Sequence, residues 1–216
     1  MRRVSATGST ADGRRYKGRT GEERRAERRA RLEAAAMEVA ATRGWSQATM
    51  TEICRVAGLT ERYFYESFGS REELYAALID DLDRELRAAA FDAVVAADLQ
   101  PAARVEAAIR AIVALYVTDP VRGRASLVEA IGDRALEDRR RRAVHGLFGL
   151  LAERWADFFP PARLADDERR ARAVAIGGAV MALISARLEG ALTLDDDALV
   201  RTVVATATAI AVAPAA

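Results

Sequence analysis

Hydrophobic residues recur along most of the chain at intervals of three and four positions, the spacing of one helix face. In 22–43, Leu32, Ala36 and Val39 share such a face, and Gly44 then ends the segment. Runs of the β-branched and aromatic residues typical of strands are nearly absent. The pattern predicts an all-α fold of about nine helices. Beyond residue 70 the expected helices are 71–97, 102–117, 119–131, 134–159, 166–189 and 196–212.

Short helical units with their own start and stop signals lie between residues 49 and 73. The sequence Thr49-Met50-Thr51-Glu52 is a capping box, and Ser70-Arg71-Glu72-Glu73 is a second one. Gly58 separates the first short helix from 61–66, for which Thr60 is the expected N-cap. Two helices of about eight residues joined by a glycine-containing turn are the helix-turn-helix pattern. We therefore expect a three-helix DNA-binding domain near the N-terminus.

The second helix of this pair begins with Glu61, Arg62 and Tyr63, the positions that meet base edges in a major groove. Arginine suits the acceptor edge of guanine. Tyrosine can contact a phosphate or the methyl group of thymine. Glu61 is open to two interpretations, because it can accept a hydrogen bond from cytosine or only favour the helix N-terminus electrostatically.

The stretch from Arg31 to Leu78 resembles the DNA-binding domain of the TetR family of transcriptional regulators. The resemblance lies in the runs Ala34–Ala36, Gly44-Trp45, Ala48–Ile53, Ala57–Thr60, Tyr63–Phe68 and Ser70–Leu74. The sequence departs from the family pattern at Cys54 (usually Ala), Ser67 (often His) and Arg71 (usually Lys), and Ser67 puts one phosphate contact in doubt. The matching stretch covers about a quarter of the chain.

The resemblance implies DNA contacts at eight positions, some of which have structural alternatives. Thr49 and Thr60 also serve as helix caps, and Tyr65 could be partly buried in the core. Phosphate contacts would set the register, and groove contacts would read the sequence. The eight residues are Thr49, Thr51, Thr60, Glu61, Arg62, Tyr63, Tyr65 and Arg71.

The C-terminal region carries no family-wide motif, so its candidates follow from helical spacing and from the family's usual dimerisation through the last two long helices. Apolar side chains between helices can line an effector pocket or be plain core, and His145 can equally be an ordinary core or surface residue. Gly177-Gly178 suits close approach of a partner helix or a tight contact within one subunit. The candidate pocket residues are Phe91, Tyr116, His145, Phe148 and Trp155, and the candidate dimer-interface residues are Gly177, Gly178, Met181 and Val203.

Charge is unevenly distributed, although the net charge is only +1. Residues 1–31 carry eleven basic and four acidic side chains, which fits either a polyanionic partner or a solvated tail. Four arginines at 139–142 suggest a second such patch, but a solvated helix face paired with Glu137 and Asp138 is the better interpretation. Asp195-Asp196-Asp197 precedes a helix and fits N-terminal capping better than metal binding.

The single cysteine and single histidine limit the chemistry that the chain can perform. Cys54 is expected to be a buried apolar residue, with a redox-sensing thiol as the alternative. There is no nucleophile–base pair, metal-ligand spacing, GxGxxG or P-loop, so we expect no enzyme, no metal and no cofactor. No signal peptide is recognisable, and apolar stretches such as 173–186 fall short of a membrane span. These observations predict a cytoplasmic protein without a membrane partner.

Together the patterns predict three regions: a flexible basic arm (1–21), a helix-turn-helix DNA-binding domain (22–70) and a helical effector-binding and dimerisation domain (71–213). The expected function is a homodimeric, sequence-specific regulator, by default a repressor released from a palindromic operator on double-stranded DNA by a small molecule. The alternatives are a nonspecific or architectural DNA-binding protein, or a helical enzyme.

Overall fold

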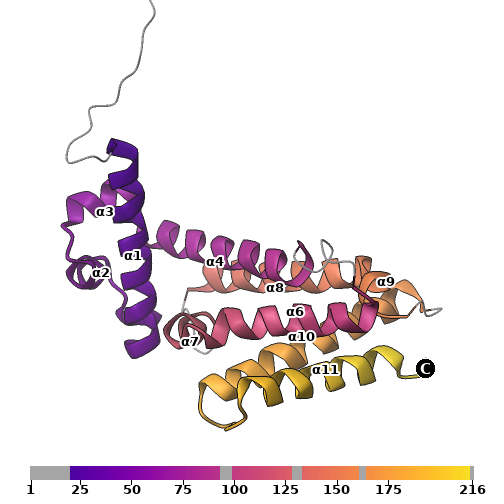
Figure 1. The fold of residues 1–216 in the computed structure, drawn as a ribbon. Helices are drawn as coiled ribbons and strands as arrows, with labels where there is room; N and C mark the ends of the chain where they lie inside the picture. Colours follow the sequence, from indigo (N-terminus) through magenta and orange to yellow (C-terminus); the bar gives the residue numbers. More distant parts are fainter. Residues whose placement is uncertain (1–19, 93–98, 128–132, 161–163, 215–216) are drawn as a thin grey trace, which may run out of the picture.

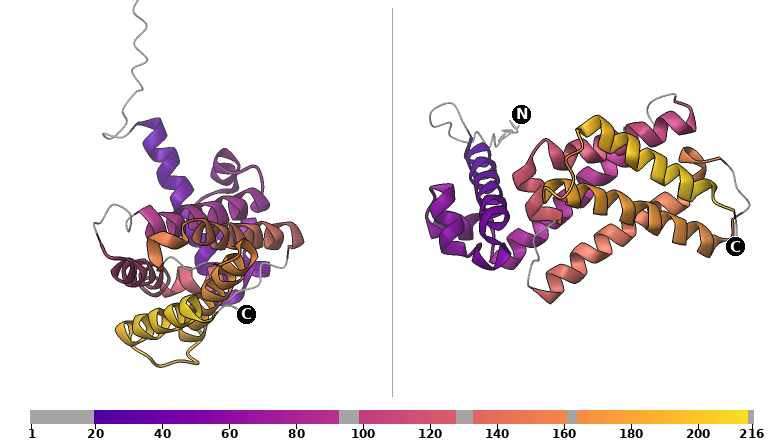
Figure 2. Two further views of the ribbon diagram at one scale, coloured as in Figure 1. Left: turned by 90° about the vertical axis from the view of Figure 1, so that its right-hand side faces the viewer. Right: turned by 90° about the horizontal axis from the view of Figure 1, so that it is seen from below.

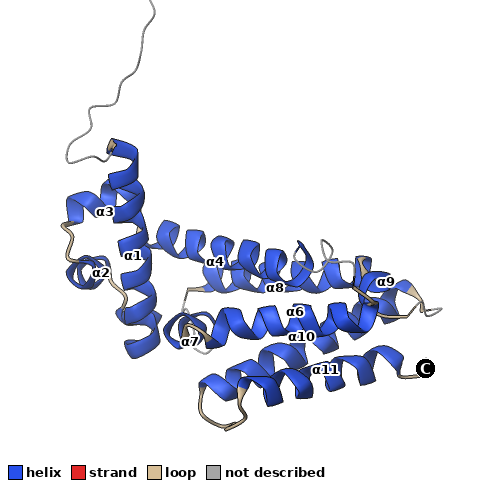
Figure 3. Cartoon of the chain, in the orientation of Figure 1, coloured by secondary structure: helices blue, strands red, loops and turns tan. Residues whose placement is uncertain are grey.

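The computed structural model describes residues 20–92, 99–127, 133–160 and 164–214, and helices dominate these ranges (Figures 1 and 3). No strand occurs among the described residues. An all-α fold was predicted and is confirmed. The α-helices are α1 (Gly21–Arg43), α2 (Met50–Ala57), α3 (Glu61–Ser67), α4 (Arg71–Arg87), α6 (Pro101–Val117), α7 (Pro120–Leu127), α8 (Arg134–Glu153), α9 (Trp155–Phe158), α10 (Asp166–Leu188) and α11 (Asp196–Val212).

The first three helices form a head at one end of the molecule, and α4 leads from it into the helical bundle (Figure 1). The core of the head contains Leu32, Ile53, Phe64 and Phe68, all almost fully buried. The same cluster continues into α4 and on to Ala125 of α7. The head and the bundle are therefore joined by shared packing.

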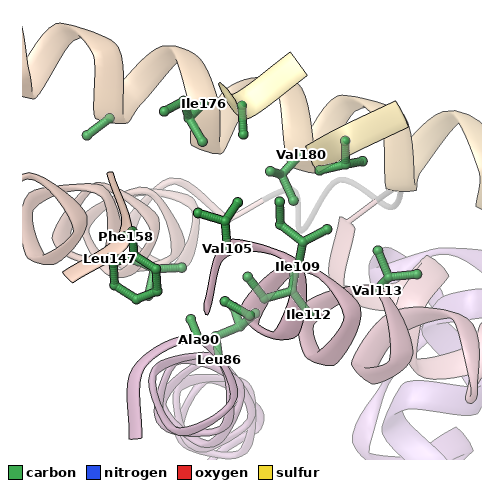
Figure 4. Packing of buried hydrophobic residues seen from close by; sticks show 14 of the residues in the cluster. Leu86, Ala90, Val105, Ile109, Ile112, Val113, Leu147, Phe158, Ile176 and Val180 are labelled. Carbon is green, nitrogen blue, oxygen red and sulfur yellow. The ribbon is translucent and has the colours of Figure 1, made fainter. Parts of the chain in front are cut away.

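The bundle core is built from α4, α6, α8, α9, α10 and α11. Figure 4 shows side chains of α6 (Val105, Ile109, Ile112) lying between Leu86 and Ala90 on one side and Ile176 and Val180 on the other. Helices α10 and α11 pack against each other along their length on one side of the bundle (Figure 2). This arrangement leaves the outer faces of α10 and α11 without a covering helix among the described residues.

Helix starts follow the expected cap chemistry only in part. The side chains of Thr49 and Ser70 accept hydrogen bonds from the backbone N–H groups of Glu52 (3.3 Å) and Glu73 (3.1 Å), as predicted. The reciprocal halves of both boxes differ, because the Glu52 carboxylate pairs with arginines and that of Glu73 accepts from the Gly69 N–H. A complete capping box forms instead at Thr20 and Glu23. Thr60 occupies the N-cap position of α3, but its side chain makes no capping hydrogen bond, which corrects the expectation of a side-chain cap there.

Several helix boundaries differ from those expected. The segment predicted as one helix over 71–97 changes to a π-helical turn at Ala88–Asp92, and 93–98 lie outside the described residues. The predicted helix 134–159 is interrupted at Arg154, whose backbone leaves the helical region. The helix predicted over 119–131 is observed as Pro120–Leu127, and residues 128–131 lie outside the described residues. The predicted arm is described only for residues 20 and 21, which already begin α1.

Helix α10 is long and apolar enough to cross a membrane by length and composition, contrary to the expectation from its apolar stretch alone. It packs against α8, α11, α7 and α6, however. Its first turns also carry arginines paired with acidic residues, as in Arg169–Asp166 at 2.6 Å. The core helices of soluble proteins meet the same criterion.

Candidate DNA interface and effector cavity

Helices α2 and α3 meet through a tight turn at Gly58. Its backbone is left-handed (φ 61°), a conformation that glycine adopts without steric cost. The N–H of Leu59 donates to the carbonyl of Cys54 at 2.9 Å, which closes the end of α2. The hydroxyl of Thr51 donates to the Glu61 carboxylate at 3.4 Å and links the two helix starts. This is the helix-turn-helix geometry that the sequence predicted.

The N-terminal residues of α3 point away from the core. Phe64 is fully buried, whereas the Arg62 side chain is 84% exposed and Tyr63 is 37% exposed. Glu61 and Thr60 are exposed as well. Because α3 buries only one side, its opposite side is open to a duplex.

Arg28 of α1 contacts the ring of Tyr63 and the carboxylate that pairs with Arg62. Arg62 pairs with Glu66 one turn later (3.1 Å), and the guanidinium of Arg28 lies 3.6 Å from the other oxygen of that carboxylate. Arg28 also stacks over the Tyr63 ring, 4.6 Å from its centroid. The Arg28 side chain therefore contacts both Glu66, which pairs with Arg62, and the ring of Tyr63.

Two further arginines of α1 bind the C-terminal ends of the short helices. Arg29 donates to the carbonyl of Ser67 (3.0 Å), and Arg31 donates to the carbonyl of Ala57 (2.5 Å). These carbonyl groups lie in the last turns of α2 and α3, where carbonyl groups have no hydrogen-bond partner within the helix. The sequence interpretation that pooled Arg28, Arg29 and Arg31 with a DNA-binding or solvated arm is thus corrected for these three. The signal was present, because Arg28 lies one helical turn before buried Leu32.

The remaining candidate DNA-contacting residues lie on the surface around α3. Thr49 and Thr51 are exposed at the start of α2. Tyr65 is 59% exposed, which removes the alternative of a core tyrosine. Arg71 lies over the Tyr75 ring at 5.5 Å and pairs with Glu72. Their contacts with DNA remain predictions.

Electrostatics in α2 stabilise its attachment to α1. Arg55 donates hydrogen bonds to Glu52 and, with the nearby charge of Arg43, lowers the pKa of that carboxyl to about 2. Burial raises the pKa of the Cys54 thiol, which keeps it protonated and favours the packing role over redox sensing.

A cavity of about 400 Å³ lies between the head and the bundle. Trp45 and Tyr75 line it on the side of the head, and α8 and α10 line it on the far side. We call this the front cavity. Two of the five predicted pocket residues, Tyr116 and His145, line it. His145 is exposed and therefore lies at its rim. Its other lining residues include Leu82, Asp83, Ser126, Glu137, Arg140 and Ser185.

A second, smaller cavity of about 70 Å³ lies deeper in the bundle and is lined by apolar side chains. Predicted pocket residues Phe91 and Phe148 belong to it. Trp155 lines neither cavity, which corrects its assignment. Its ring centroid lies 4.6 Å from that of Phe159 in the core, and its indole N–H has no hydrogen-bond partner among the described residues.

The charged runs noted in the sequence have partners within the chain. Arg139 pairs with Asp80, Arg140 with Glu137 (2.9 Å) and Arg141 with Asp138 (3.7 Å), as predicted for a paired helix face. Arg140 and Arg141 also line the front cavity, a role that the sequence did not predict. Asp195 accepts from the Ala198 N–H at 2.7 Å, which confirms capping.

Comparison with known proteins agrees with this geometry. The profile of the family described as "Bacterial regulatory proteins, tetR family" matches residues 32–78, which span the helix-turn-helix and its flanks. Residues 32–78 therefore form a DNA-binding domain of the TetR type. Among curated proteins, none matches the sequence.

Solved structures share the TetR-family fold at low sequence identity. The fatty acid degradation regulator FadR from Bacillus halodurans has a TM-score of 0.71 at 18% identity, covering 83% of this chain and 94% of that one. FadR from Bacillus subtilis, solved in complex with stearoyl-CoA, has a TM-score of 0.68 at 16% identity, covering 85% and 97%. A TetR-like regulator from a Rhodococcus species has a TM-score of 0.64 at 19% identity, covering 83% and 93%.

Two of the four predicted dimer-interface residues point inward. Val203 is 1% exposed, and a Cβ on Gly177 would lie 2.0 Å from the Phe148 ring, so Gly177 makes a close contact within the subunit. Gly178 is exposed with no neighbour near its missing side chain. Met181 is half-buried and lines both cavities.

Proposed function

We propose that the protein is a homodimeric, cytoplasmic repressor that binds a palindromic operator and is released by a small molecule held in the front cavity. The division into a basic arm (1–21), a DNA-binding domain (22–70) and an effector-binding and dimerisation domain (71–213) is part of this proposal. The observation that carries it is the position of that cavity, which is lined both by Trp45 of the head and by α8 and α10 of the bundle. A ligand there contacts both units.

DNA reading is assigned to the exposed face of α3. Arg62 would contact a guanine edge, and Tyr63 a phosphate or a thymine methyl group. Exposed Thr60 leaves its hydroxyl available to the groove, since it makes no capping bond. Thr49, Thr51, Tyr65 and Arg71 would hold the phosphates on either side and supply salt-dependent affinity. Glu61, joined to Thr51, fits an electrostatic role at the start of α3.

Dimerisation is assigned to the outer faces of α10 and α11. Both helices expose small and apolar side chains there in helical register, which suits close helix packing between subunits. Association through these faces would place two copies of α3 for successive major grooves, about 34–36 Å apart. The exposed residues concerned are Val174, Ala175 and Gly178 on α10 and Ala205, Ala209 and Val212 on α11.

Coupling is assigned to the junction of α1, α4 and α7. The Tyr75 hydroxyl donates to the carbonyl of Ala48 at 2.6 Å, and the rings of Trp45 and Tyr75 meet edge to face at 4.5 Å. Both rings line the cavity, so a ligand that favours one placement of α4 would also move the head. The stearoyl-CoA named with the similar FadR of Bacillus subtilis supports a largely apolar effector.

The experiment is a footprint of the purified full-length protein on the DNA upstream of its own gene and of neighbouring genes. Protection of one palindromic sequence supports the proposal. Uniform coverage without a preferred sequence would instead establish the nonspecific, architectural alternative. Added compounds that bind the protein and remove the protection support release by ligand. If every compound that binds leaves operator affinity unchanged, the coupling part of the proposal is wrong.

A further inference from the structure

The front cavity and the second, smaller cavity are neighbouring chambers of one site, here called the front chamber and the rear chamber. Leu147 of α8 and Met181 of α10 line both of them, so these two side chains form the partition. The front chamber has the volume of an ordinary ligand site, and the rear chamber is large enough only for part of a ligand. Methionine is unbranched and adapts its conformation to its neighbours, so Met181 can yield to a group that passes it.

The chambers differ in chemistry. The rear chamber is surrounded by aliphatic and aromatic side chains, among them Ile109, Phe158 and Ile176. The front chamber carries four hydroxyl-bearing side chains, Tyr75, Tyr116, Ser126 and Ser185. Tyr75 donates to the Ala48 carbonyl, whereas within the described residues the hydroxyls of the other three form no hydrogen bond. These three hydroxyls are therefore available to donate hydrogen bonds to an acceptor that a ligand supplies.

The two acidic side chains of the front chamber are each paired with an arginine. Asp83 accepts from Arg87 at 2.8 Å, and Glu137 accepts from Arg140 at 2.9 Å. The carboxylates therefore offer little to a cationic ligand. The hydroxyls of Tyr116, Ser126 and Ser185 are hydrogen-bond donors, so an oxygen acceptor fits this chamber.

We infer that the effector is an amphipathic molecule whose carbonyl or carboxylate oxygens bind near Tyr116 and whose apolar arm passes between Leu147 and Met181 into the rear chamber. This inference rests on the proposed function, because it names the ligand class of the same cavity. Phe148 sets the depth of the rear chamber, since its ring lies on Gly177, where any side chain would collide with it.

The test is calorimetric titration of the full-length protein with straight-chain alkanoates from butanoate to palmitate. We expect binding to tighten by about fourfold for each added methylene until the rear chamber is filled, and then to level off. Ala108 and Ala207 line the rear chamber only. Ala108→Leu should leave short alkanoates unaffected, move the plateau to a shorter chain and weaken the longest ligands by about tenfold or more.

The matched control is Ala114→Leu, the same change at an exposed position of the same helix, which should behave as wild type. Ala207→Leu fills the rear chamber from α11 and should change the chain-length dependence in the same way. It provides the test if Ala108→Leu does not fold. Tyr116→Phe should weaken all alkanoates by about tenfold without changing the slope per methylene.

The inference is overturned if no alkanoate binds, or if both filled variants keep the wild-type length dependence. Either result leaves the ligand-free footprint on the operator unaffected. A failure of the proposed function would instead appear as absent or unspecific protection of DNA. The two failures are thus distinguishable.

Discussion

The indole N–H of Trp45 donates a hydrogen bond to the carbonyl oxygen of Ala125 at 2.9 Å, joining the head to α7 across 80 residues of sequence. Both groups are buried. The contact directly links the head to the part of the bundle that encloses the front cavity.

Replacing this indole should reveal the contribution of the contact to stability. Trp45→Phe leaves the Ala125 carbonyl buried without its partner, so we expect the free energy of unfolding to fall by about 1–3 kcal/mol beyond the lost packing. Trp155→Phe is the matched control, because the buried indole N–H of Trp155 has no partner to lose. Urea denaturation followed by circular dichroism measures both. Equal losses in the two variants would contradict a specific role for the Trp45 bond.

Operator affinity should depend on the exposed residues at the start of α3. Arg62→Ala or Tyr63→Ala is expected to weaken binding by about 1–3 kcal/mol through a lost base contact, with the dimer intact. Arg142→Ala removes the same charge from an exposed position on α8, away from the proposed dimer face, and should leave affinity nearly unchanged. Fluorescence anisotropy with labelled operator at fixed salt gives the three values. Wild-type binding by both α3 variants would rule out α3 as the recognition helix.

The caps provided by α1 should be visible as stability. Arg31→Ala removes the donor to the carbonyl of Ala57, and we expect a loss of about 1–2 kcal/mol in the free energy of unfolding. Arg25 lies on the same helix and is exposed, so Arg25→Ala should stay within about 0.5 kcal/mol of wild type. Thermal and urea melts of both variants provide the comparison, and similar stabilities would argue against capping.

The depressed pKa of Glu52 predicts a pH dependence. Its folded value of about 2 lies below the ordinary 4.5, so the ionised carboxylate stabilises the fold above about pH 4.5. That contribution is lost as the pH falls toward the folded value. The stability difference between wild type and Glu52→Gln should therefore shrink between about pH 5 and pH 2, and also shrink with added salt. A difference that stays constant over this range would mean that the carboxylate is not stabilised by Arg55.

The proposed dimer face can be tested by placing a charge on it. Ala175→Arg puts a long cation among the small exposed residues of α10, and we expect dissociation to monomers and loss of operator binding. Ala114→Arg makes the same change on an exposed part of α6 and should remain dimeric. Sedimentation velocity distinguishes the two states. A dimeric Ala175→Arg variant would mean that subunits associate elsewhere.

Local signals were enough to predict the all-α fold and the exposed face of α3. Helical spacing identified the buried side of α2 and α3, and the glycine at 58 marked the turn, because both depend on neighbours within a few residues. The exposure of Arg62 beside buried Phe64 follows from the same periodicity.

What the sequence could not predict depends on contacts between distant segments. From the sequence, the adjacent Gly177 and Gly178 were equally good candidates for a subunit interface. Only the position of Phe148 on another helix shows that Gly177 faces inward. Trp155 has the apolar character of a pocket residue, but its place in the fold puts it against Phe159. The division of the cavity by Leu147 and Met181 likewise depends on how α8 and α10 pack.

The arginines of α1 that close the ends of α2 and α3 make the recognition unit longer than its two short helices. A segment limited to 49–68 would carry all the residues proposed to contact DNA except Arg71, while leaving the carbonyls of Ala57 and Ser67 without their partners. A chimera that exchanges DNA specificity between relatives would accordingly have to transfer α1 together with the helices that it supports.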